Sequence, residues 1–248
     1  MKLKILLVGE SWVSLSTHIK GFNFFASGGY ETGVEWFRKA MASEGVDWVH
    51  MPSHIAQSEF PFTVGSLRDY SAIILSDVGA DTFLLHPDTW VKGKRTPNRL
   101  KVIEEYVKGG GGLIMAGGYL SFQGLNGMAR YNGTPIENAL PITIYQYDDR
   151  CEVPEGIEPI KKGSHIVTEG LPDRWPFILG YNKLQTKDGS EVLATVNGDP
   201  FLTLWSYGRG RAAAWATDIG PHWCPPAFAE WEGYSLLWNR LLKWVSSG

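Results

Sequence analysis

Short, mostly apolar runs constrain the fold of this chain more than any other feature of its sequence. They lack the polar alternation of a half-exposed strand, which is typical of strands covered by helices on both faces. We therefore expect buried strands at four places. These are Lys4–Gly9, Val46–Met51, Ala72–Ser76 and Leu113–Ala116.

Helical patterns separate these strands. Glu31–Glu44 places Val34, Phe37 and Met41 on one stripe, and Pro97–Lys108 repeats apolar residues at the same spacing. Strands that alternate with helices form right-handed βαβ units with a parallel sheet. The sequence thus predicts an α/β fold of the flavodoxin-like type, with an open, mainly parallel sheet and helices on both faces.

The second half has further strand signals and a final helix. Gly208–Gly210 is a turn signal between two strand-like runs, so we expect a late β-hairpin there. The C-terminal segment Ala229–Val245 carries aromatic and aliphatic residues on one helical stripe. The strands expected in this half are Ile142–Tyr147, Glu191–Val196, Phe201–Tyr207 and Arg211–Thr217.

No clear linker divides the chain. We expect a single domain over residues 1–248, and an inserted lid or subdomain at about 122–180 stays open. The stretch Glu10–Tyr30 is polar, aromatic and rich in glycine, and we interpret it as a long loop.

Charge and cysteine content narrow the class of protein. A net charge of −3 gives no electrostatic reason to expect nucleic acid or an anionic membrane as a partner. The N-terminal apolar run is too short for a signal peptide, and no run approaches the roughly 18–20 apolar residues that span a bilayer. The two cysteines, Cys151 and Cys224, stand far apart, which favours a reducing compartment. We therefore expect a cytoplasmic protein.

In an open parallel sheet, the residues that follow the strands face a common crevice. Glu10 and Trp12 follow the first strand, where Glu10 would serve as a base or a hydroxyl-binding carboxylate and Trp12 as a stacking wall. Asp77 follows the third strand and is either a pocket carboxylate or a turn former. The competing interpretation makes Glu10 a backbone cap and Trp12 a core residue.

The fourth strand ends in glycines. Gly117 and Gly118, with Tyr119 and Ser121 behind them, would form an anion or oxyanion cradle from exposed backbone N–H groups. The alternative is a turn that requires positive φ. Ser121 is a weak candidate nucleophile, because no Gly-x-Ser-x-Gly elbow surrounds it.

Asp218 and His222 offer acid–base chemistry near the C-terminus. Asp218 could orient His222 as a general base, or the two could be a capping carboxylate and an exposed loop histidine. His18 is interpreted as a solvated loop histidine and Cys224 as a buried, inert thiol. We expect no metal site, because Pro52 interrupts the His50–His54 spacing, and we expect no cofactor.

Three stretches resemble one superfamily. Tyr106–Phe122 contains a helix end, a glycine run and a strand. Ser164–Pro172 is similar to a His-x-Ile-x-x-Gly-Leu-Pro pattern, and Leu204–Arg211 is followed by Thr217–Gly220. Their order over nearly the whole chain resembles the class I glutamine amidotransferase-like superfamily, in its uncharacterised branch beside the ThuA-like proteins.

That resemblance implies a cysteine at the turn after the fourth strand, and a later His-Pro-Glu sequence. Here Gly118 or Tyr119 stands in the place of the nucleophile, and no Glu follows two residues after His222. Cysteine-dependent glutamine hydrolysis is therefore not expected, and whether the protein is an enzyme stays open.

We expect the crevice to bind a small polar metabolite, and the ThuA-like kinship suggests a sugar or a sugar-derived acid. The alternatives are a hydrolase or isomerase that uses His222 with Asp218 or Glu10, and a homo-oligomeric assembly module. In the last case the aromatic C-terminal helix would form the interface. Trp205 and Trp223 are further candidates to flank the crevice.

Overall fold

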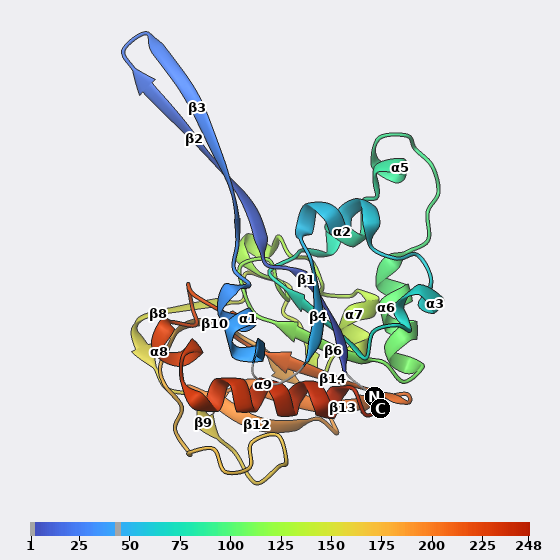
Figure 1. Cartoon of the computed structure of the whole chain (residues 1–248), viewed down its shortest axis with the longest axis vertical. Helices are drawn as coiled ribbons and strands as arrows, with labels where there is room; N and C mark the ends of the chain where they lie inside the picture. The colour runs from blue at the N-terminus through green and yellow to red at the C-terminus, as the bar shows by residue number, and fades with distance from the viewer. Residues whose placement is uncertain (1–2, 43–45) are drawn as a thin grey trace.

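An eight-stranded sheet forms the centre of the molecule in the computed structural model, which describes residues 3–42 and 46–248 (Figure 1). All four strands expected in the first half are present in it, and the predicted α/β fold is confirmed. In spatial order the strands are β4 (Asp47–Met51), β1 (Lys4–Gly9), β5 (Ala72–Ser76), β6 (Gly112–Ala116), β14 (Gly210–Trp215), β13 (Asp199–Tyr207), β12 (Glu191–Val196) and β9 (Ile160–Lys161).

The sheet is mainly parallel. β4, β1, β5, β6 and β14 run in the same direction, whereas β13, β12 and β9 continue in antiparallel pairs. The predicted late hairpin is the β13–β14 pair. Its second strand lies beside β6 as a fifth parallel strand, so the segment after Trp215 leaves the sheet at the same edge as the segments after β1, β5 and β6.

Helices cover both faces of the sheet. On one face, α1 (Glu35–Ala42) packs against α9 (Glu232–Val245) through Phe37 and Trp238, whose rings meet edge to face. The helices of the other layer contact one another. They are α2 (Ser53–Glu59), α3 (Val64–Leu67), α4 (Ala80–Leu84) and α6 (Arg99–Lys108). The remaining short helices are α5 (Pro87–Trp90), α7 (Pro135–Ala139), α8 (Pro226–Ala229) and the 3₁₀ turn η1 (Leu125–Gly127).

Local chemistry sets the helix ends. α6 starts after Asn98, whose side-chain oxygen accepts hydrogen bonds from the backbone N–H groups of Leu100 and Lys101. α9 begins later than the predicted Ala229, because Pro226–Ala229 forms the separate helix α8. α1 begins at Glu35 rather than Glu31, and its predicted end at Glu44 lies outside the described residues.

The aromatic stripe of α9 packs inside the molecule. Tyr234 and Trp238 are fully buried, and Trp231 and Trp244 pack against the core. Most of the stripe is thus covered by the chain's own sheet and by α1, and the suggestion that this helix forms a subunit interface stays a prediction.

The segment expected to be a long loop is a β-hairpin. β2 (Ser11–Lys20) and β3 (Asn23–Thr32) pair over ten positions and project from the body of the protein (Figure 1). The loop interpretation gave weight to glycine and serine, but the run also alternates apolar and polar residues with a period of two, which is a strand signal. We call residues Ser11–Thr32 the arm.

The region 122–180 is joined to the body at several points. β9 pairs with β12, and β8 (Arg150–Ile157) forms a separate two-stranded sheet with β10 (Ile178–Asn182). The strand predicted over Ile142–Tyr147 is limited to β7 (Ile142–Thr143), which pairs with β11 (Gln185–Thr186).

Candidate functional site

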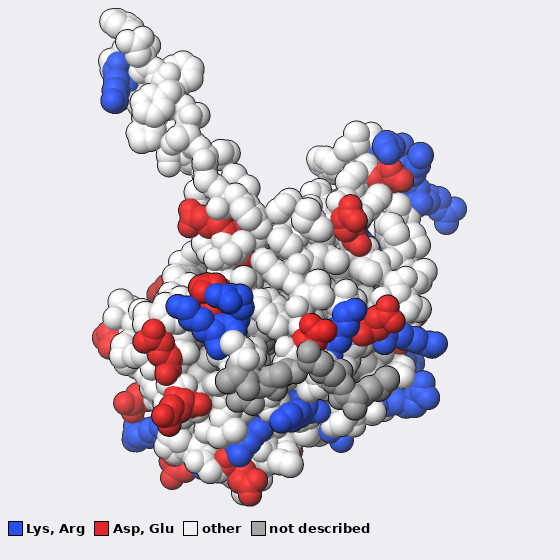
Figure 2. Space-filling view, in the orientation of Figure 1, with Lys and Arg blue, Asp and Glu red and all other residues white. Residues whose placement is uncertain are grey.

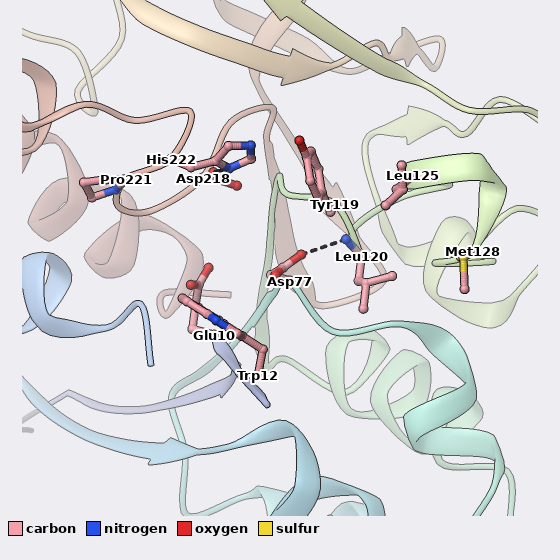
Figure 3. Close-up of a pocket in the computed structure, with 10 residues that line it drawn as sticks. All are labelled: Glu10, Trp12, Asp77, Tyr119, Leu120, Leu125, Met128, Asp218, Pro221 and His222. Carbon is pink, nitrogen blue, oxygen red and sulfur yellow. Dashed lines mark hydrogen bonds and ion pairs between the residues drawn. The ribbon is translucent and has the colours of Figure 1, made fainter. Parts of the chain in front are cut away.

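A pocket of about 450 Å³ lies where the parallel strands end. Six of the residues singled out in the sequence line it, and hydrophobic side chains complete the wall on one side (Figure 3). The lining residues are Glu10, Trp12, Asp77, Tyr119, Leu120, Leu125, Met128, Asp218, Pro221 and His222.

Glu10 and Asp77, two acidic residues of the pocket, have unusual backbone conformations. Glu10 follows β1 and Asp77 follows the neighbouring strand β5, and both have φ of 45°, in the left-handed region. A glutamate rarely adopts this conformation without a surrounding structure that enforces it. At Glu10 two backbone hydrogen bonds do so, since its N–H donates to the carbonyl of Ser76 and its carbonyl accepts from the N–H of Gly33.

Glu10 is a buried carboxyl group. Its Oε1 accepts a 2.6 Å hydrogen bond from the hydroxyl of Ser76. Burial raises its pKa well above the ordinary value for glutamate, and the nearby carboxylates of Asp77 and Asp218 raise it further. A protonated Glu10 can donate a hydrogen bond as well as accept one.

Asp77 has a similar environment but stays nearer to solvent. Burial raises its pKa to about 6, with a further increase from Asp218, although the 2.7 Å hydrogen bond from the Leu120 N–H to Oδ1 acts in the opposite direction. The backbone N–H of Asp77 donates to Oγ of Ser121. These two bonds tie the end of β5 to the turn after β6.

Asp218 orients His222. Oδ2 of Asp218 lies 2.8 Å from Nδ1 of His222 and also accepts the backbone N–H of Trp223 at 2.9 Å. Burial disfavours the charged imidazole, but the hydrogen bond and the charges of Asp218, Glu152 and Asp77 outweigh it, so the pKa of His222 is raised. With Nδ1 bonded to Asp218, Nε2 is the nitrogen left to exchange a proton with a bound molecule.

Aromatic rings form the wall on the His222 side. The ring of Tyr119 meets that of His222 edge to face at 4.6 Å, and His222 stacks on Trp223 at 5.2 Å. Glu152 of β8 accepts hydrogen bonds from Oη of Tyr119 and Nε1 of Trp223. The guanidinium of Arg150 lies 5.3 Å from the centre of the Tyr119 ring.

Glu152 and Arg150 were not identified from the sequence, because they lie in a strand outside the main sheet. Leu125 and Met128 were missed for a similar reason, since they lie in and beside a 3₁₀ turn far from any strand end. The one sequence signal for these two residues is the alternation of a basic and an acidic side chain at 150–152. This pattern is common on solvated strands, so it does not indicate a functional site.

The glycine turn, which was predicted as an anion cradle, has several of its N–H groups bonded within the protein. The N–H of Gly117 donates to the carbonyls of Trp215 and Thr217, and that of Gly118 donates to Oδ1 of Asn182. The Leu120 N–H is bonded to Asp77. These three donors are occupied within the protein, and an anion cradle formed by the rest of the turn stays a prediction.

Gly118 also has a steric role, because it leaves space between two carboxyl groups. Its φ is 138°, and a Cβ atom there would lie 2.9 Å from Oδ1 of Asp77 and 3.1 Å from Oδ1 of Asp218. Of the two positions considered for a nucleophile, Gly118 is therefore the one whose side chain would point between the carboxylates. Glycine leaves that space open.

Other candidates lie away from the pocket wall. Ser121 is buried, and its hydroxyl accepts the Asp77 N–H, which does not suit a nucleophile. His18 stacks on Phe25 in the arm. Trp205 does not flank the pocket, because its Nε1 donates to the carbonyl of Ala139 on another side of the sheet. Trp223 lies behind the aromatic wall.

Cys224 is fully buried, and burial raises the pKa of its thiol well above the usual range, with Asp218 and Glu10 adding to the effect. Within residues 3–42 and 46–248, no three His, Cys, Asp or Glu side chains are placed to hold a metal ion together. Over the same residues, the structure contains no helix that is long and apolar enough to span a bilayer.

Two solved structures resemble this chain closely. The cytoplasmic proteins STM3548 of Salmonella typhimurium and STM1381 of Salmonella typhimurium LT2 are each 40% identical to it, with a TM-score of 0.94. Each match covers 98% of this chain and 99% of the other. Their names agree with the cytoplasmic location expected from the sequence.

A more distant structure shows the same fold. A ThuA-like protein from Bacteroides uniformis matches with a TM-score of 0.55 and 14% identity, over 96% of this chain and 89% of the other. A search of curated proteins found no match. A family model described as "Putative glutamine amidotransferase" matches residues 4–247. The resemblance inferred from the sequence is thereby confirmed, and the chain belongs to this glutamine amidotransferase-like family.

Proposed function

We propose that the pocket binds a small, neutral, polyhydroxylated molecule such as a sugar. The observation that supports this most strongly is the group of three carboxyl side chains, Glu10, Asp77 and Asp218, between the rings of Trp12 and Tyr119 (Figure 3). Carboxyl groups accept hydrogen bonds from hydroxyls, and flat aromatic faces pack against the apolar face of a sugar ring.

Charge favours a neutral ligand over a sugar-derived acid. The pocket already contains three acidic groups, and burial, with their mutual repulsion added to it, raises the pKa values of Glu10 and Asp77. A ligand carboxylate would add a further negative charge to a partly desolvated site, with His222 as the nearest group among the lining residues that can carry a positive charge.

Thiol-dependent glutamine hydrolysis has no support from the cysteines. The thiol of Cys224 is buried. The pKa of the Cys151 thiol is raised, and burial is the main cause. Neither cysteine lines the pocket, and Gly118 occupies the turn where the nucleophile is expected. We expect no release of ammonia from glutamine.

Thermal-shift titration at pH 7.5 tests the binding proposal. The panel contains neutral sugars, polyols, sugar acids and glutamine, since a ligand selective for the native state raises the unfolding temperature. We expect a neutral sugar or polyol to stabilise the protein. Trp12→Ala and Asp218→Asn should each weaken that ligand by about tenfold or more, which corresponds to at least about 1.4 kcal/mol.

Trp90→Ala is the matched control, because Trp90 is an exposed tryptophan on α5 that does not line the pocket. It should leave the affinity unchanged. Stabilisation by sugar acids alone, or by a sugar whose affinity is equal in the Trp12→Ala and Trp90→Ala variants, would contradict the proposal.

A second candidate function is proton-transfer catalysis by His222. The 2.8 Å hydrogen bond between Asp218 and Nδ1 is the arrangement that orients a histidine as a general base. Protonated Glu10 would be the acid. An isomerase of the bound sugar, or a hydrolase acting on it, would use this pair.

Incubating the protein in D₂O with the ligand found by titration tests this candidate. Mass spectrometry detects carbon-bound deuterium for an isomerase and cleavage products for a hydrolase. His222→Gln should remove the reaction while changing the affinity less than about threefold. Because a base must be neutral and the pKa of His222 is raised, the rate should rise with pH through a midpoint above the ordinary histidine value of about 6.5. An equal rate in His222→Gln would refute this role.

A further inference from the structure

The pocket has a polar side and an apolar side. The polar side contains the three carboxyl groups described above. The apolar side, which we call the apolar pocket wall, consists of Leu120, Leu125 and Met128. In the view of Figure 3 these three side chains lie on the far side of Asp77 from Glu10. A molecule that fills the pocket therefore meets hydrogen-bond acceptors at one end and hydrocarbon at the other.

The apolar pocket wall is open to solvent in the single chain. Leu120 is 36% exposed and Met128 is 60% exposed. A ligand that covers these side chains removes apolar surface from water, which is favourable. Concave apolar surface beside a few convergent polar groups is also the usual composition of a small-molecule site.

The turn around Leu125 is fixed to the body of the protein. The backbone N–H groups of Gln123 and Gly124 donate to the carboxylate of Asp149, both at 2.9 Å. Asp149 is itself buried. The N–H of Leu125 donates to the carbonyl of Tyr119 at 2.8 Å. These bonds hold the turn in one position beside the pocket.

Several residues of this turn have left-handed backbone conformations. Phe122 and Asn126 each have a φ of 53°, and Arg130 has a φ of 64°. Such angles are uncommon for residues other than glycine, and they persist where the surrounding structure enforces them, often at ligand sites. The chain thus accepts backbone strain in the segment that holds Leu125 and Met128 at the pocket.

The polar side presents acceptors without partners. Within residues 3–42 and 46–248, no hydrogen bond reaches Oε2 of Glu10, Oδ2 of Asp77 or Oδ1 of Asp218. Buried polar groups are normally hydrogen-bonded, and carboxyl oxygens accept from hydroxyl groups. These three oxygens therefore suit a ligand that carries several hydroxyl groups on one side.

The arm does not contribute to the apolar pocket wall. The structure describes every residue of the arm, and Trp12 is the one among them that lines the pocket. The rest of the arm projects away from the body, as Figure 2 shows. A ligand in the pocket therefore meets the apolar pocket wall, and not the exposed apolar residues of the arm.

We propose that the ligand is a glycoside in which a sugar is joined to a compact apolar group, such as a short alkyl or phenyl group. This inference rests on the sugar-binding function proposed above and names the class of sugar derivative. The sugar hydroxyls donate to the carboxyl groups, and the apolar group packs on the apolar pocket wall. The volume of about 450 Å³ lies within the range of about 300–1,000 Å³ that holds drug-sized molecules, so both parts fit.

A molecule with only one of these two parts leaves half of the pocket unmatched. A free sugar leaves Leu120 and Met128 in contact with water. A wholly apolar molecule covers three carboxyl groups without giving them hydrogen bonds, which carries a large desolvation cost. A glycoside matches both sides of the pocket.

Isothermal titration calorimetry of the full chain tests the inference. The ligands are both anomers of the methyl, butyl and phenyl glycosides of glucose, galactose and mannose. We expect the butyl glycoside of the preferred sugar to bind about tenfold more tightly than its methyl glycoside, because each fully buried methylene contributes about fourfold. The phenyl glycoside should gain a similar factor over the methyl glycoside.

Leu120→Gln combined with Met128→Gln makes the apolar pocket wall polar and should lower the ratio of butyl to methyl affinity to about threefold or less. Leu236→Gln combined with Ile166→Gln is the matched control, because these residues are 37% and 66% exposed and do not line the pocket. The control should keep the ratio. Both double variants replace exposed side chains and should unfold within about 2 °C of the wild type.

Asp218→Asn separates this inference from the sugar-binding proposal, since it should weaken the methyl and butyl glycosides by the same factor. Equal affinities of the wild type for the two glycosides would refute the apolar group and leave sugar binding intact. An unchanged ratio in the Leu120 and Met128 double variant would do the same. If neither a free sugar nor any glycoside binds, sugar binding itself is wrong, and this inference is wrong with it.

Discussion

The pocket and the arm share Trp12 but depart from ordinary burial in opposite ways. The pocket brings three carboxyl groups together in a partly dry space, whereas the arm leaves large apolar side chains in water. Each departure costs stability in the isolated chain. Natural sequences tolerate such departures at functional sites, so the comparison points to a function for both regions.

The largest effect is expected in the pocket, from Gly118→Ala. The new Cβ would meet the carboxylates of Asp77 and Asp218 at 2.9 and 3.1 Å, and alanine rarely adopts a φ of 138°. We expect a loss of about 2–4 kcal/mol in the free energy of unfolding, measured by urea denaturation.

Gly110→Ala separates the backbone strain from the clash. Gly110 has a φ of 117°, and a Cβ there would meet nothing within 4 Å. This variant should lose about half as much stability or less. Equal losses at the two positions would mean that the carboxylates do not crowd Gly118.

A smaller and opposite effect is expected from Asp77→Asn. The folded-state pKa of Asp77 is about 6, above the unfolded value of about 3.9, so the folded protein holds more protons between these values and its stability falls as pH rises through this window. The amide still accepts the Leu120 N–H. At pH 8 the variant should be more stable than the wild type by about 1–2 kcal/mol, allowing for partial exposure.

Thermal unfolding at pH 4 and pH 8 measures this difference, which should nearly vanish at the lower pH. Asp69→Asn, at an exposed aspartate, should change stability little at either pH. A destabilised Asp77→Asn protein at pH 8 would show that the carboxylate is held by interactions stronger than the repulsion from its neighbours.

The smallest effect is expected from shortening the arm. Ser14 and Gly29 are opposite each other, so residues 15–28 can be replaced by an Asn-Gly turn. The arm makes few contacts with the body, and the unfolding temperature of dilute protein should change by about 2 °C or less. A loss of several degrees would mean that the arm stabilises the single chain. The arm would then no longer differ from the pocket as a region that the rest of the fold does not need.

The pocket could be predicted from the sequence because one topological rule gathers its residues. Glu10, Asp77 and Tyr119 follow parallel strands, and such strands end at one edge of the sheet. Asp218 joins them because β14 is a fifth parallel strand beside β6, although the sequence identified that strand only as half of a hairpin. The roles assigned to these residues stay predictions.

The remaining parts depend on packing that no local pattern encodes. Glu152 reaches Tyr119 from a strand in a different sheet, and nothing near residue 152 specifies that contact. The glycine turn was predicted as an anion site because free N–H groups were assumed, but Asn182, about 60 residues away, accepts one of them. The arm was misinterpreted because its glycines and serines hid a two-residue period.

The hydrogen bond between the Gly33 N–H and the Glu10 carbonyl closes the base of the arm at a residue that also supplies a pocket carboxyl. The arm, with ten paired positions, therefore leaves the body directly beside Glu10. A displacement of the base of the arm would act on the backbone of Glu10, whose φ of 45° lies in a small allowed region. The base of the arm and the wall of the pocket thus depend on the same backbone torsion angle.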